Sequence, residues 1–385
     1  MSINYGKQNI NQNDIDSVSN TLRDRYITQG PKVDEFELVL KNKFGSKYCC
    51  ALSSGTSALH LAAIALGWNK DDIIISTPIT FVASINCIRY VNATPDFVDI
   101  NNNNFTIDPN KLEDKINKYR IKKKKIKAVI GVDYAGHPAD WKTLRFLADK
   151  YDFRLVNDNC HAMGASYYND TKYAIKYADV VVQSYHPVKH ITTGEGGAVF
   201  TNDRSIDEKI RTLRSHGISK KKNSKNIGSW HYEMHEIGFN YRITDLQSAL
   251  GISQLNRLND FVSMRRKIAK QYNELLSNNE NCIIPKTSKN VEHAYHLYPL
   301  QGKFEKNKNN KIVFFEKMKH NGIELQVHYI PVHLQPYYKK NYNFKQGDFP
   351  LAEDFYKKEF SIPIYPGLER SQISKIVDEI KKNLI

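Results

Sequence analysis

The sequence of 385 residues contains little cysteine, with five residues and no C-x-x-C pair among them. They are Cys49, Cys50, Cys87, Cys160 and Cys282. An odd cysteine count without metal-ligand spacing excludes a disulfide framework and a structural zinc site. We therefore expect no bound metal. The chain is 41% hydrophobic, so it can bury a core large enough to stabilise the fold by itself.

Long hydrophobic runs are also absent from the sequence. No stretch approaches the ~20 apolar residues that a membrane-spanning helix needs. Residues 1–5 lack the basic and then apolar pattern of a signal peptide. The sequence therefore predicts a cytoplasmic protein without a membrane partner.

Acidic side chains are scarce relative to basic ones. The chain has 56 Lys and Arg against 41 Asp and Glu, which gives a formal net charge of +15. Such a balance favours anionic partners, namely nucleic acid, a membrane surface or a phosphorylated small molecule. The chain has no helix-turn-helix, zinc-finger or RNP pattern, and its lysines are dispersed. We expect a phosphorylated small molecule, and a nucleic-acid-binding protein remains the alternative.

Strand-like and helix-like segments alternate along residues 1–250. This alternation predicts an α/β fold, with a mostly parallel sheet covered by helices on both faces. Sheets of this kind bind ligands at the carboxyl ends of their strands. The expected strands are 48–52, 72–76, 95–100, 128–134, 154–157, 179–184 and 197–201, and the expected helices are 56–66, 81–91 and 141–150.

The pattern changes after Thr244, where leucines and a valine recur at helical spacing. They predict one helix from Thr244 to about Leu276, long enough to bridge two domains. The length of the chain also favours two domains, at roughly 150 residues each. We place a large domain at 1–255 and a smaller C-terminal α+β domain at 256–385. The latter should hold a helix at 314–322, an extended aromatic stretch at 326–338 and a final helix from Ser371.

Small hydroxyl residues follow the first expected strand, in Ser53-Ser54-Gly55-Thr56-Ser57. They lie between a strand and the N-terminus of a helix. Free backbone N–H groups, the helix dipole and the hydroxyls can together bind a phosphate there. A plain N-cap with a tight turn explains the same residues equally well.

An acid and a lysine occur at the ends of two later strands. Asp158 ends the strand 154–157, and Lys189 follows the strand 179–184 just before a glycine-rich turn. Burial lowers the pKa of a lysine amine and makes it a nucleophile. The turn Gly194-Glu195-Gly196-Gly197 lacks the spacing of a dinucleotide fingerprint. A phosphate-binding turn, an acid and a lysine, in this order, are the components of a pyridoxal phosphate site.

These stretches resemble the DegT-type sugar aminotransferases, a family of fold-type I pyridoxal phosphate enzymes. The resemblance covers nearly the whole chain. It implies a large domain with a mostly parallel mixed sheet, followed by a smaller C-terminal α+β domain. The matching stretches are 28–31, 54–59, 80–83, Asp158 with His161-Ala162, 184–197, 238–245 and 328–333.

The resemblance implies a cofactor role for each matching residue. Lys189 would carry pyridoxal 5'-phosphate as a Schiff base, and Asp158 would pair with its pyridinium nitrogen. Phe81 would stack on the cofactor ring, and His161 would lie near the ring hydroxyl. The residues expected to hold the phosphate are Thr56, Ser57 and Ser184, with Asn240 reaching it from a neighbouring subunit.

The resemblance also implies the substrate and the assembly. The motifs His186-Pro187-Val188-Lys189 and 328–338 are most similar to the UDP-4-amino-4,6-dideoxy-N-acetyl-β-L-altrosamine transaminases of pseudaminic acid synthesis. L-Glutamate would then donate an amino group to C4 of a UDP-linked 4-keto-6-deoxy-N-acetylhexosamine. Two such chains would share their active sites in a homodimer. The residues expected to line the nucleotide-sugar cleft are Tyr241, Arg242, His328 and Tyr329.

Two alternatives to this function remain at this point. One is the same chemistry on another nucleotide-linked 4-keto or 3-keto sugar, such as a D-configured one. The other is a pyridoxal-dependent sugar dehydratase, in which a histidine replaces the lysine. Lys189 argues against a dehydratase, although His190 is its neighbour. Around the acid, Asn159 and Cys160 stand where the family often has small residues, and we expect them to change packing but not chemistry.

Overall fold

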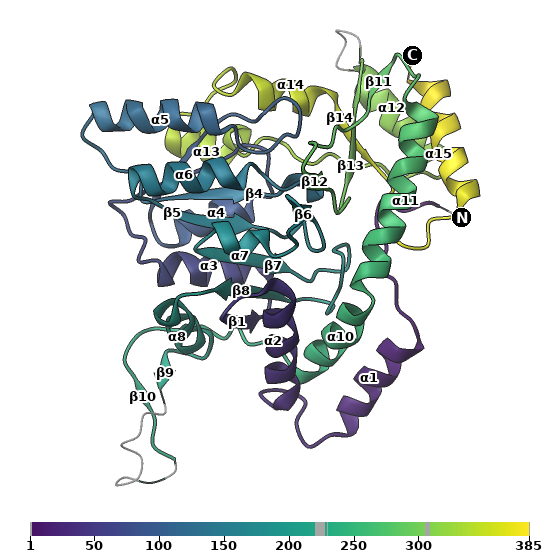
Figure 1. The fold of residues 1–385 in the computed structure, drawn as a ribbon. Coiled ribbons are helices and arrows are strands. Elements are labelled where there is room, and N and C mark those ends of the chain that lie inside the picture. The colour runs from purple at the N-terminus through teal and green to yellow at the C-terminus, as the bar shows by residue number, and fades with distance from the viewer. Residues whose placement is uncertain (1, 220–227, 229, 305–308, 385) are drawn as a thin grey trace.

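A seven-stranded sheet forms the centre of the N-terminal part of the chain (Figure 1). This computed structural model describes residues 2–219, 228, 230–304 and 309–384. The strands are β1 (Tyr48–Leu52), β2 (Ile73–Ser76), β3 (Thr94–Phe97), β4 (Ala128–Val132), β5 (Arg154–Asp158), β7 (Val180–Ser184) and β8 (Gly197–Thr201). Their order is β1-β8-β7-β5-β4-β2-β3, and only β8 runs antiparallel to its neighbours. The prediction of a mostly parallel mixed sheet is confirmed.

Helices cover both faces of this sheet, and the strand residues alternate between two core clusters. Val129 of β4 packs with α2 (Pro31–Phe44), α5 (Pro109–Ile121) and α6 (Trp141–Tyr151). Ile130 packs with α3 (Gly55–Ala65), α4 (Ala83–Tyr90) and α8 (Arg204–Arg214). Successive side chains of a strand point to opposite faces of the sheet. Since the residues at nearly every strand position are apolar, both faces of the sheet are buried under helices. The carboxyl ends of the strands are then the natural place for a ligand.

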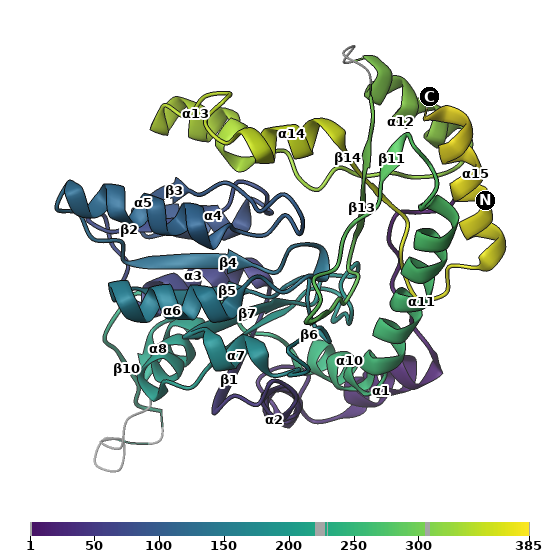
Figure 2. The ribbon, with the colours of Figure 1, turned by 45° about the horizontal axis from the view of Figure 1, so that its top comes forward.

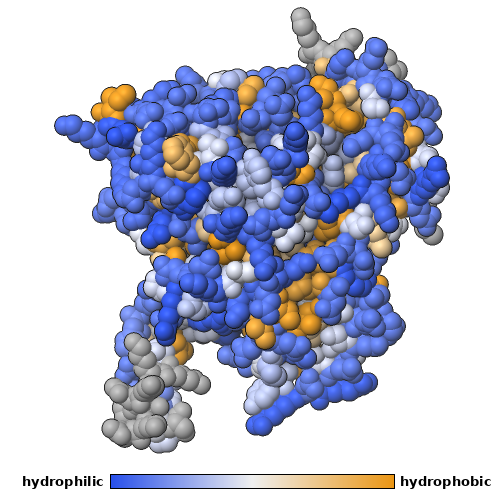
Figure 3. All heavy atoms as spheres, in the orientation of Figure 1, coloured by the Kyte–Doolittle hydropathy of each residue, from blue (hydrophilic) through white to orange (hydrophobic). Residues whose placement is uncertain are grey.

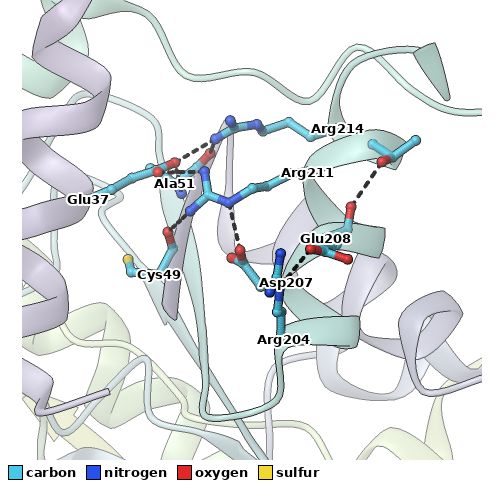
Figure 4. A network of polar contacts seen from close by, with 9 residues as sticks. Glu37, Cys49, Ala51, Arg204, Asp207, Glu208, Arg211 and Arg214 are labelled. Carbon is cyan, nitrogen blue, oxygen red and sulfur yellow. Dashed lines mark hydrogen bonds and ion pairs between the residues drawn. The ribbon is translucent and has the colours of Figure 1, made fainter. Parts of the chain in front are cut away.

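An ion-pair network ties the edge strand β1 to two helices (Figure 4). The carboxylate of Glu37, on α2, accepts hydrogen bonds from Arg211 (2.7 Å) and Arg214 (2.6 Å) on α8. It also accepts the backbone N–H of Ala51 in β1 (2.9 Å), whose carbonyl oxygen binds Arg214 (2.8 Å). Breaking a buried pair of this kind costs about 3–5 kcal/mol. The network therefore fixes β1, and with it the Ser53–Ser57 turn that follows.

Two helices, α10 (Asp245–Asn256) and α11 (Leu258–Leu276), connect this sheet to a second unit. We expected one continuous helix over this stretch, and the structure divides it at Arg257. The guanidinium of Arg257 donates to Asn9 (2.9 Å) and to the carboxylate of Asp14, and it lies 4.7 Å from the centre of the Phe261 ring. These contacts join the bend to the N-terminal segment and to α1 (Gln12–Arg23).

The second unit contains a three-stranded sheet of β11 (Cys282–Ile283), β13 (Tyr298–Gly302) and β14 (Glu359–Ile362). It packs with α11, α12 (Asn309–His320) and α15 (Arg370–Asn383) in a third core cluster, which also includes Ile3 from the N-terminus. Figure 2 shows the helices α13 (Pro336–Tyr342) and α14 (Pro350–Lys358) extending back over the first unit. The division at residue 255 stays a prediction.

The extended stretch that we expected at 326–338 is wrong for its second half. Gln326 pairs with Ser361 of β14, but Val332–Leu334 form a 3₁₀ turn and Pro336 begins α13. Proline at the first position of a helix is favourable, because its missing N–H would have no helical partner there. Tyr338, which we expected at the end of the extended stretch, is instead buried on this helix.

A hairpin projects from the first unit (Figures 1 and 2), formed by β9 (Ile218–Ser219) and β10 (Glu233–Met234). It carries exposed apolar side chains, among them Trp230 and Ile237. Figure 3 shows a mostly hydrophilic face, on which apolar side chains gather near α10. Among the residues that the structure describes, no helix combines the length and apolar character that crossing a membrane requires.

Candidate active site

A cavity of about 480 Å³ lies at the carboxyl ends of β1, β4, β5 and β7. This is the size of a typical site for a small ligand. Most of the residues predicted to form the site line it, namely Thr56, Phe81, Asp158, His161, Ser184, Lys189, His328 and Tyr329. The structure therefore brings together side chains that are far apart in the sequence.

The Ser53–Ser57 turn forms one wall of the cavity. Ser54 caps α3, since its hydroxyl accepts the N–H of Ser57 (3.0 Å) and Ser57 reciprocates by accepting the N–H of Ser54 (3.0 Å). Ser57 also donates to the carbonyl oxygen of Ser54 (2.7 Å) and does not line the cavity. Its hydroxyl is thus used inside the turn, whereas Thr56 lines the open side. A phosphate held here would meet Thr56 and the N-terminus of α3.

Ser184 closes this wall from β7. A Cβ atom on Gly55 would lie 2.9 Å from the Cβ of Ser184. Real Cβ atoms do not approach so closely, so glycine at this position lets the helix N-terminus approach the end of β7. The requirement explains the glycine in the Ser-Gly-Thr sequence.

Asp158 lies at the end of β5 and is 7% exposed. One of its carboxylate oxygens accepts the hydroxyl of Ser84 (2.6 Å), and the other accepts the N–H of Cys160 (3.2 Å). The hydroxyls of Thr80 and Ser84 are 2.8 Å apart, one turn from each other at the start of α4. These bonds hold the carboxylate in one orientation toward the cavity.

Lys189 follows β7, and its amine enters the same cavity. No residue within the described part of the chain forms a hydrogen bond or ion pair with its Nζ atom. Burial lowers the pKa of this amine, and Arg265 adds to the lowering, while the nearby Cys160 and the carboxylate of Asp158 act in the opposite direction. Arg265 is itself 1% exposed, and its guanidinium donates to the carbonyl oxygen of Ile364 (2.7 Å). An amine without a hydrogen-bond partner that faces a cavity becomes a nucleophile whenever it loses its proton, and a lowered pKa makes that loss easier.

His161 and Tyr329 are hydrogen-bonded to each other in the cavity wall. Nδ1 of His161 accepts the N–H of Ala135 (3.3 Å), so its proton is on Nε2, which lies 3.1 Å from the hydroxyl oxygen of Tyr329. The ring of His296 lies 4.3 Å from that of His161, centre to centre. Burial and the nearby charge of Lys189 keep the pKa of His161 well below its usual value. His161 is therefore a neutral hydrogen-bonding group at neutral pH.

Phe81 and Tyr5 lie at the rim of the cavity. Phe81 is 56% exposed, and its ring centre is 6.0 Å from that of Tyr329. Tyr5 comes from the N-terminal segment, with its ring 5.6 Å from that of His328. An exposed aromatic ring at the mouth is free to cover a planar ligand.

The remaining predicted residues, Asn240, Tyr241 and Arg242, lie outside the cavity. Asn240 is exposed, and its backbone pairs with Ser215. The hydroxyl of Tyr241 lies 3.2 Å from Nδ1 of His60, and its carbonyl oxygen accepts the N–H of Ser53 (2.9 Å). The segment thus runs behind the Ser53–Ser57 turn of its own chain and presents Asn240 outward.

Several cavity residues were not predicted from the sequence. Ser84 could have been found, because it lies one helical turn after Thr80. Tyr5 and His296 carry no local signal, since each reaches the cavity only through the tertiary fold. Cys160 also lines the cavity, and burial raises the pKa of its thiol well above the usual value. This thiol is protonated at neutral pH and packs against the acid rather than acting as a nucleophile.

The cavity has what pyridoxal phosphate requires. A helix N-terminus with the hydroxyls of Thr56 and Ser184 suits a phosphate, a buried carboxylate suits a pyridinium nitrogen, and Lys189 offers an amine without a partner among the described residues. Within residues 2–384, apart from the segments that the structure does not describe, no cluster of His, Cys, Asp or Glu could hold a metal ion.

Known proteins resemble this chain along its whole length. It is 38% identical over 389 residues to the UDP-4-amino-4,6-dideoxy-N-acetyl-beta-L-altrosamine transaminase of Campylobacter jejuni, with 99% of each chain covered. Its structure matches that of Helicobacter pylori PseC, an aminotransferase of pseudaminic acid biosynthesis, with a TM-score of 0.90 and 31% identity over 100% and 99% of the two chains.

A third similar protein is a sugar aminotransferase from Streptococcus pneumoniae, solved in a PMP-form with a TM-score of 0.91, 27% identity and coverage of 99% and 98%. The same protein was also solved in a PLP-form. Residues 8–381 match a single family along nearly the full length of the chain. The chain belongs to the DegT/DnrJ/EryC1/StrS aminotransferase family.

Proposed function

We propose that this protein transfers the amino group of L-glutamate to C4 of a UDP-linked 4-keto-6-deoxy-N-acetylhexosamine, giving UDP-4-amino-4,6-dideoxy-N-acetyl-β-L-altrosamine. The observation that carries this proposal is the unbonded amine of Lys189, opposite the carboxylate of Asp158 in one cavity. The printed name of the Campylobacter jejuni relative supports the choice of sugar. The excess of basic residues suits a nucleotide diphosphate group.

The cofactor of this family of aminotransferases is pyridoxal phosphate. When it is bound, this cofactor accepts the electrons of the bond that breaks at the substrate carbon. In this chain, Thr56 and Ser184 would hold its phosphate at the N-terminus of α3, and Phe81 would cover its ring. Asp158, fixed by Ser84, would keep a proton on its ring nitrogen, because a buried carboxylate favours the protonated form.

Lys189 acts as the base of the reaction. Its Nζ atom takes the proton from the glutamate carbon that bears the amino group, and it returns a proton to C4 of the sugar in the second half of the reaction. Burial, with a further contribution from Arg265, lowers the pKa of this amine, which makes it easier for the amine to give up its own proton before it accepts another. His161, neutral and hydrogen-bonded to Tyr329, would lie beside the cofactor ring without adding a charge to the site.

The sugar nucleotide binds between two chains in this proposal. Asn240 and Arg242 lie outside the cavity of their own chain, so they can serve the cavity of a partner in a homodimer. Arg242, partly exposed and without an ion-pair partner in the described residues, suits the diphosphate. We place the enzyme in the cytoplasm, where nucleotide sugars would reach it.

A substrate panel tests the proposed function. The purified protein would be given glutamate with UDP-linked 4-keto-6-deoxy-N-acetylhexosamines of L and D configuration, and with a 3-keto analogue. The proposal predicts the fastest amination for the L-configured 4-keto sugar. Faster turnover of a D-configured or 3-keto sugar would replace this substrate with the other. Loss of water from the sugar without amination would identify a dehydratase.

A further inference from the structure

Three side chains form a hydrogen-bonded row from the second unit into the cavity. They are Glu359 and Ser361 on β14 and His328 in the segment that pairs beside it. Their exposed fractions are 0%, 1% and 8%. Nδ1 of His328 lies 2.9 Å from the hydroxyl oxygen of Ser361, which donates to a carboxylate oxygen of Glu359 (2.6 Å). Only His328 reaches the cavity, so the other two act through it.

The hydrogen bonds determine where the protons are when Glu359 is ionised. One carboxylate oxygen accepts the backbone N–H of His328 (2.9 Å), and the other accepts the hydroxyl proton of Ser361. The oxygen of Ser361 must then accept a proton from Nδ1 of His328. Nε2, which has no hydrogen-bond partner among the described residues, therefore offers a lone pair to the cavity.

Protonation of Glu359 reverses the direction of the hydrogen bonds along the row. The carboxyl O–H then donates to the oxygen of Ser361, and the hydroxyl of Ser361 donates to Nδ1 of His328. The proton of the imidazole is now on Nε2, which becomes a donor toward the cavity. In total the row has gained one proton. Ser361 has given its proton to Glu359, Nδ1 of His328 has given its proton to Ser361, and Nε2 has taken up the new one, so the imidazole is neutral in both arrangements.

The surroundings favour a proton on Glu359 over a proton on His328. Burial, together with the charge of Lys189, lowers the pKa of His328 to about 3, so the imidazole does not become charged. Burial raises the pKa of Glu359 to about 8. The basic group that faces Glu359 is Lys311 on α12, whose amine donates to the carbonyl oxygen of Tyr356 (2.7 Å). Burial lowers the pKa of Lys311 to about 8, so the two groups titrate over the same range of pH.

Apart from Lys189, the groups packed around the rest of the row are uncharged. Tyr134, from the loop after β4, donates its hydroxyl proton to the carbonyl oxygen of His328. Tyr5 and Tyr329 pack against the imidazole ring, and His161 faces it from the opposite wall of the cavity. Burial keeps the hydroxyls of Tyr134 and Tyr329 protonated by raising their pKa well above the usual value.

We propose that Glu359 and Ser361 are positioning residues that make Nε2 of His328 either a donor or an acceptor, so that one neutral imidazole serves both substrates of the aminotransferase. A ketone oxygen can only accept a hydrogen bond, whereas an amino group donates one. The keto sugar is bound by the donor form, and the amino group of glutamate or of the aminated sugar by the acceptor form. This inference rests on the proposed function for the identity of the two ligands.

Nitrogen NMR tests the row without any turnover. In the pyridoxal phosphate-loaded enzyme with ¹⁵N-labelled histidine, the two ring nitrogens of His328 distinguish the tautomers, and a His328→Gln sample assigns them. As pH rises from about 6 to about 10, the proton should move from Nε2 to Nδ1 around pH 8, where Glu359 ionises. Ser361→Ala should make the tautomer independent of pH, and Ser361→Thr should restore the change.

The contrary results are equally definite. One unchanging tautomer in the unsubstituted enzyme, or a charged imidazole at pH 6 to 7, would overturn the proposal. Ser361→Ala should slow amination of the keto sugar about tenfold, as expected for loss of one oriented hydrogen bond, and Ser361→Thr should recover most of it. An unchanged rate would overturn the role in substrate binding. Failure of the sugar substrate itself leaves the NMR result intact, so the two failures are distinguishable.

Discussion

Asp158 and Asn240 come from two regions of the molecule that differ in how they are held. Asp158 is 7% exposed, and both of its carboxylate oxygens are hydrogen-bonded within its own chain. Asn240 is exposed, and only its backbone pairs with a neighbour. A group that does chemistry needs a fixed orientation, which burial and bonding provide. In the proposed dimer, one chain would fix the cofactor, while Asn240 in the 238–242 segment would act on a second chain.

The largest expected effect concerns the buried cofactor site, where the side chains are held in fixed orientations. Lys189→Ala removes the base but leaves Asp158, Thr56 and Ser184 in place, so the cofactor should still bind. We expect turnover to fall at least about a thousandfold. Steady-state kinetics with glutamate and the keto sugar would measure this loss. Near-normal turnover would show that another base moves the proton.

Asp158→Asn should have the next largest effect, because it keeps the shape and removes the charge. A carboxylate in a buried site shifts the pKa of a partner by about two units, which corresponds to about a hundredfold in rate. The first half-reaction, followed by the cofactor absorbance on mixing with glutamate, should slow by this factor while glutamate binding changes little. Ser84→Ala, which frees the same carboxylate, serves as the matched variant with a smaller loss. An unchanged half-reaction would remove Asp158 from this role.

Mixed dimers test whether the exposed segment serves a partner. Lys189→Ala and the double variant Asn240→Asp, Arg242→Ala should each be inactive alone. Random mixing makes about half of the dimers hybrid, and each hybrid restores one of its two sites, so activity should approach roughly a quarter of the unsubstituted level. Native mass spectrometry would confirm that hybrids form. Hybrids without activity would mean that the segment acts within its own chain.

Arg265 should shift the pKa of Lys189 without touching substrate. Its guanidinium is buried behind the lysine, where it donates to backbone carbonyl oxygens, and it lowers the pKa of the amine. Arg265→Met should raise that pKa. The pH dependence of the rate at which the apoenzyme takes up pyridoxal phosphate reports it, since the neutral amine reacts. Arg265→Lys keeps the charge and should keep the midpoint, whereas an unchanged midpoint in the methionine variant would contradict the electrostatic role.

The last expected effect concerns stability in acid rather than turnover. Burial lowers the pKa of a group of buried histidines, to about 4 for His137 and about 3 for His328. The others in this group are His161, His190, His293 and His296. Such histidines are neutral in the folded chain and carry no penalty above pH 6.5, but as pH falls below it the unfolded chain binds protons that the folded chain does not.

Each of these histidines should therefore cost about 1.4 kcal/mol of unfolding free energy per pH unit below 6.5, until its folded pKa is reached. Melting temperatures measured between about pH 7 and about pH 4 should fall steeply. His137→Gln should make the slope shallower, and His320→Gln, at an exposed position, should leave it unchanged. A melting temperature that is flat over this range would contradict the burial of neutral histidines.

The sequence predicted the fold and the positions of the residues that follow strands better than the contacts between the two units. Asp158 and Lys189 follow apolar strands, so their position at one edge of a parallel sheet could be inferred from strand spacing. Tyr5 and His296 could not, because only packing between the two units brings them to the cavity. The break at Arg257 also depends on tertiary contacts, with Asn9 and α1. The hydroxyl of Ser57 bonds inside the turn, which the sequence did not indicate, and its contact with a phosphate stays a prediction.

The most direct test of the central claim identifies the lysine that carries the cofactor. The enzyme loaded with pyridoxal phosphate would be reduced with borohydride, digested and mapped by mass spectrometry. We predict that the cofactor is attached to the peptide that contains Lys189, and that the label is lost in Lys189→Ala. Attachment to another lysine, or no covalent attachment in a protein that binds the cofactor, would contradict the assignment of this cavity as the active site.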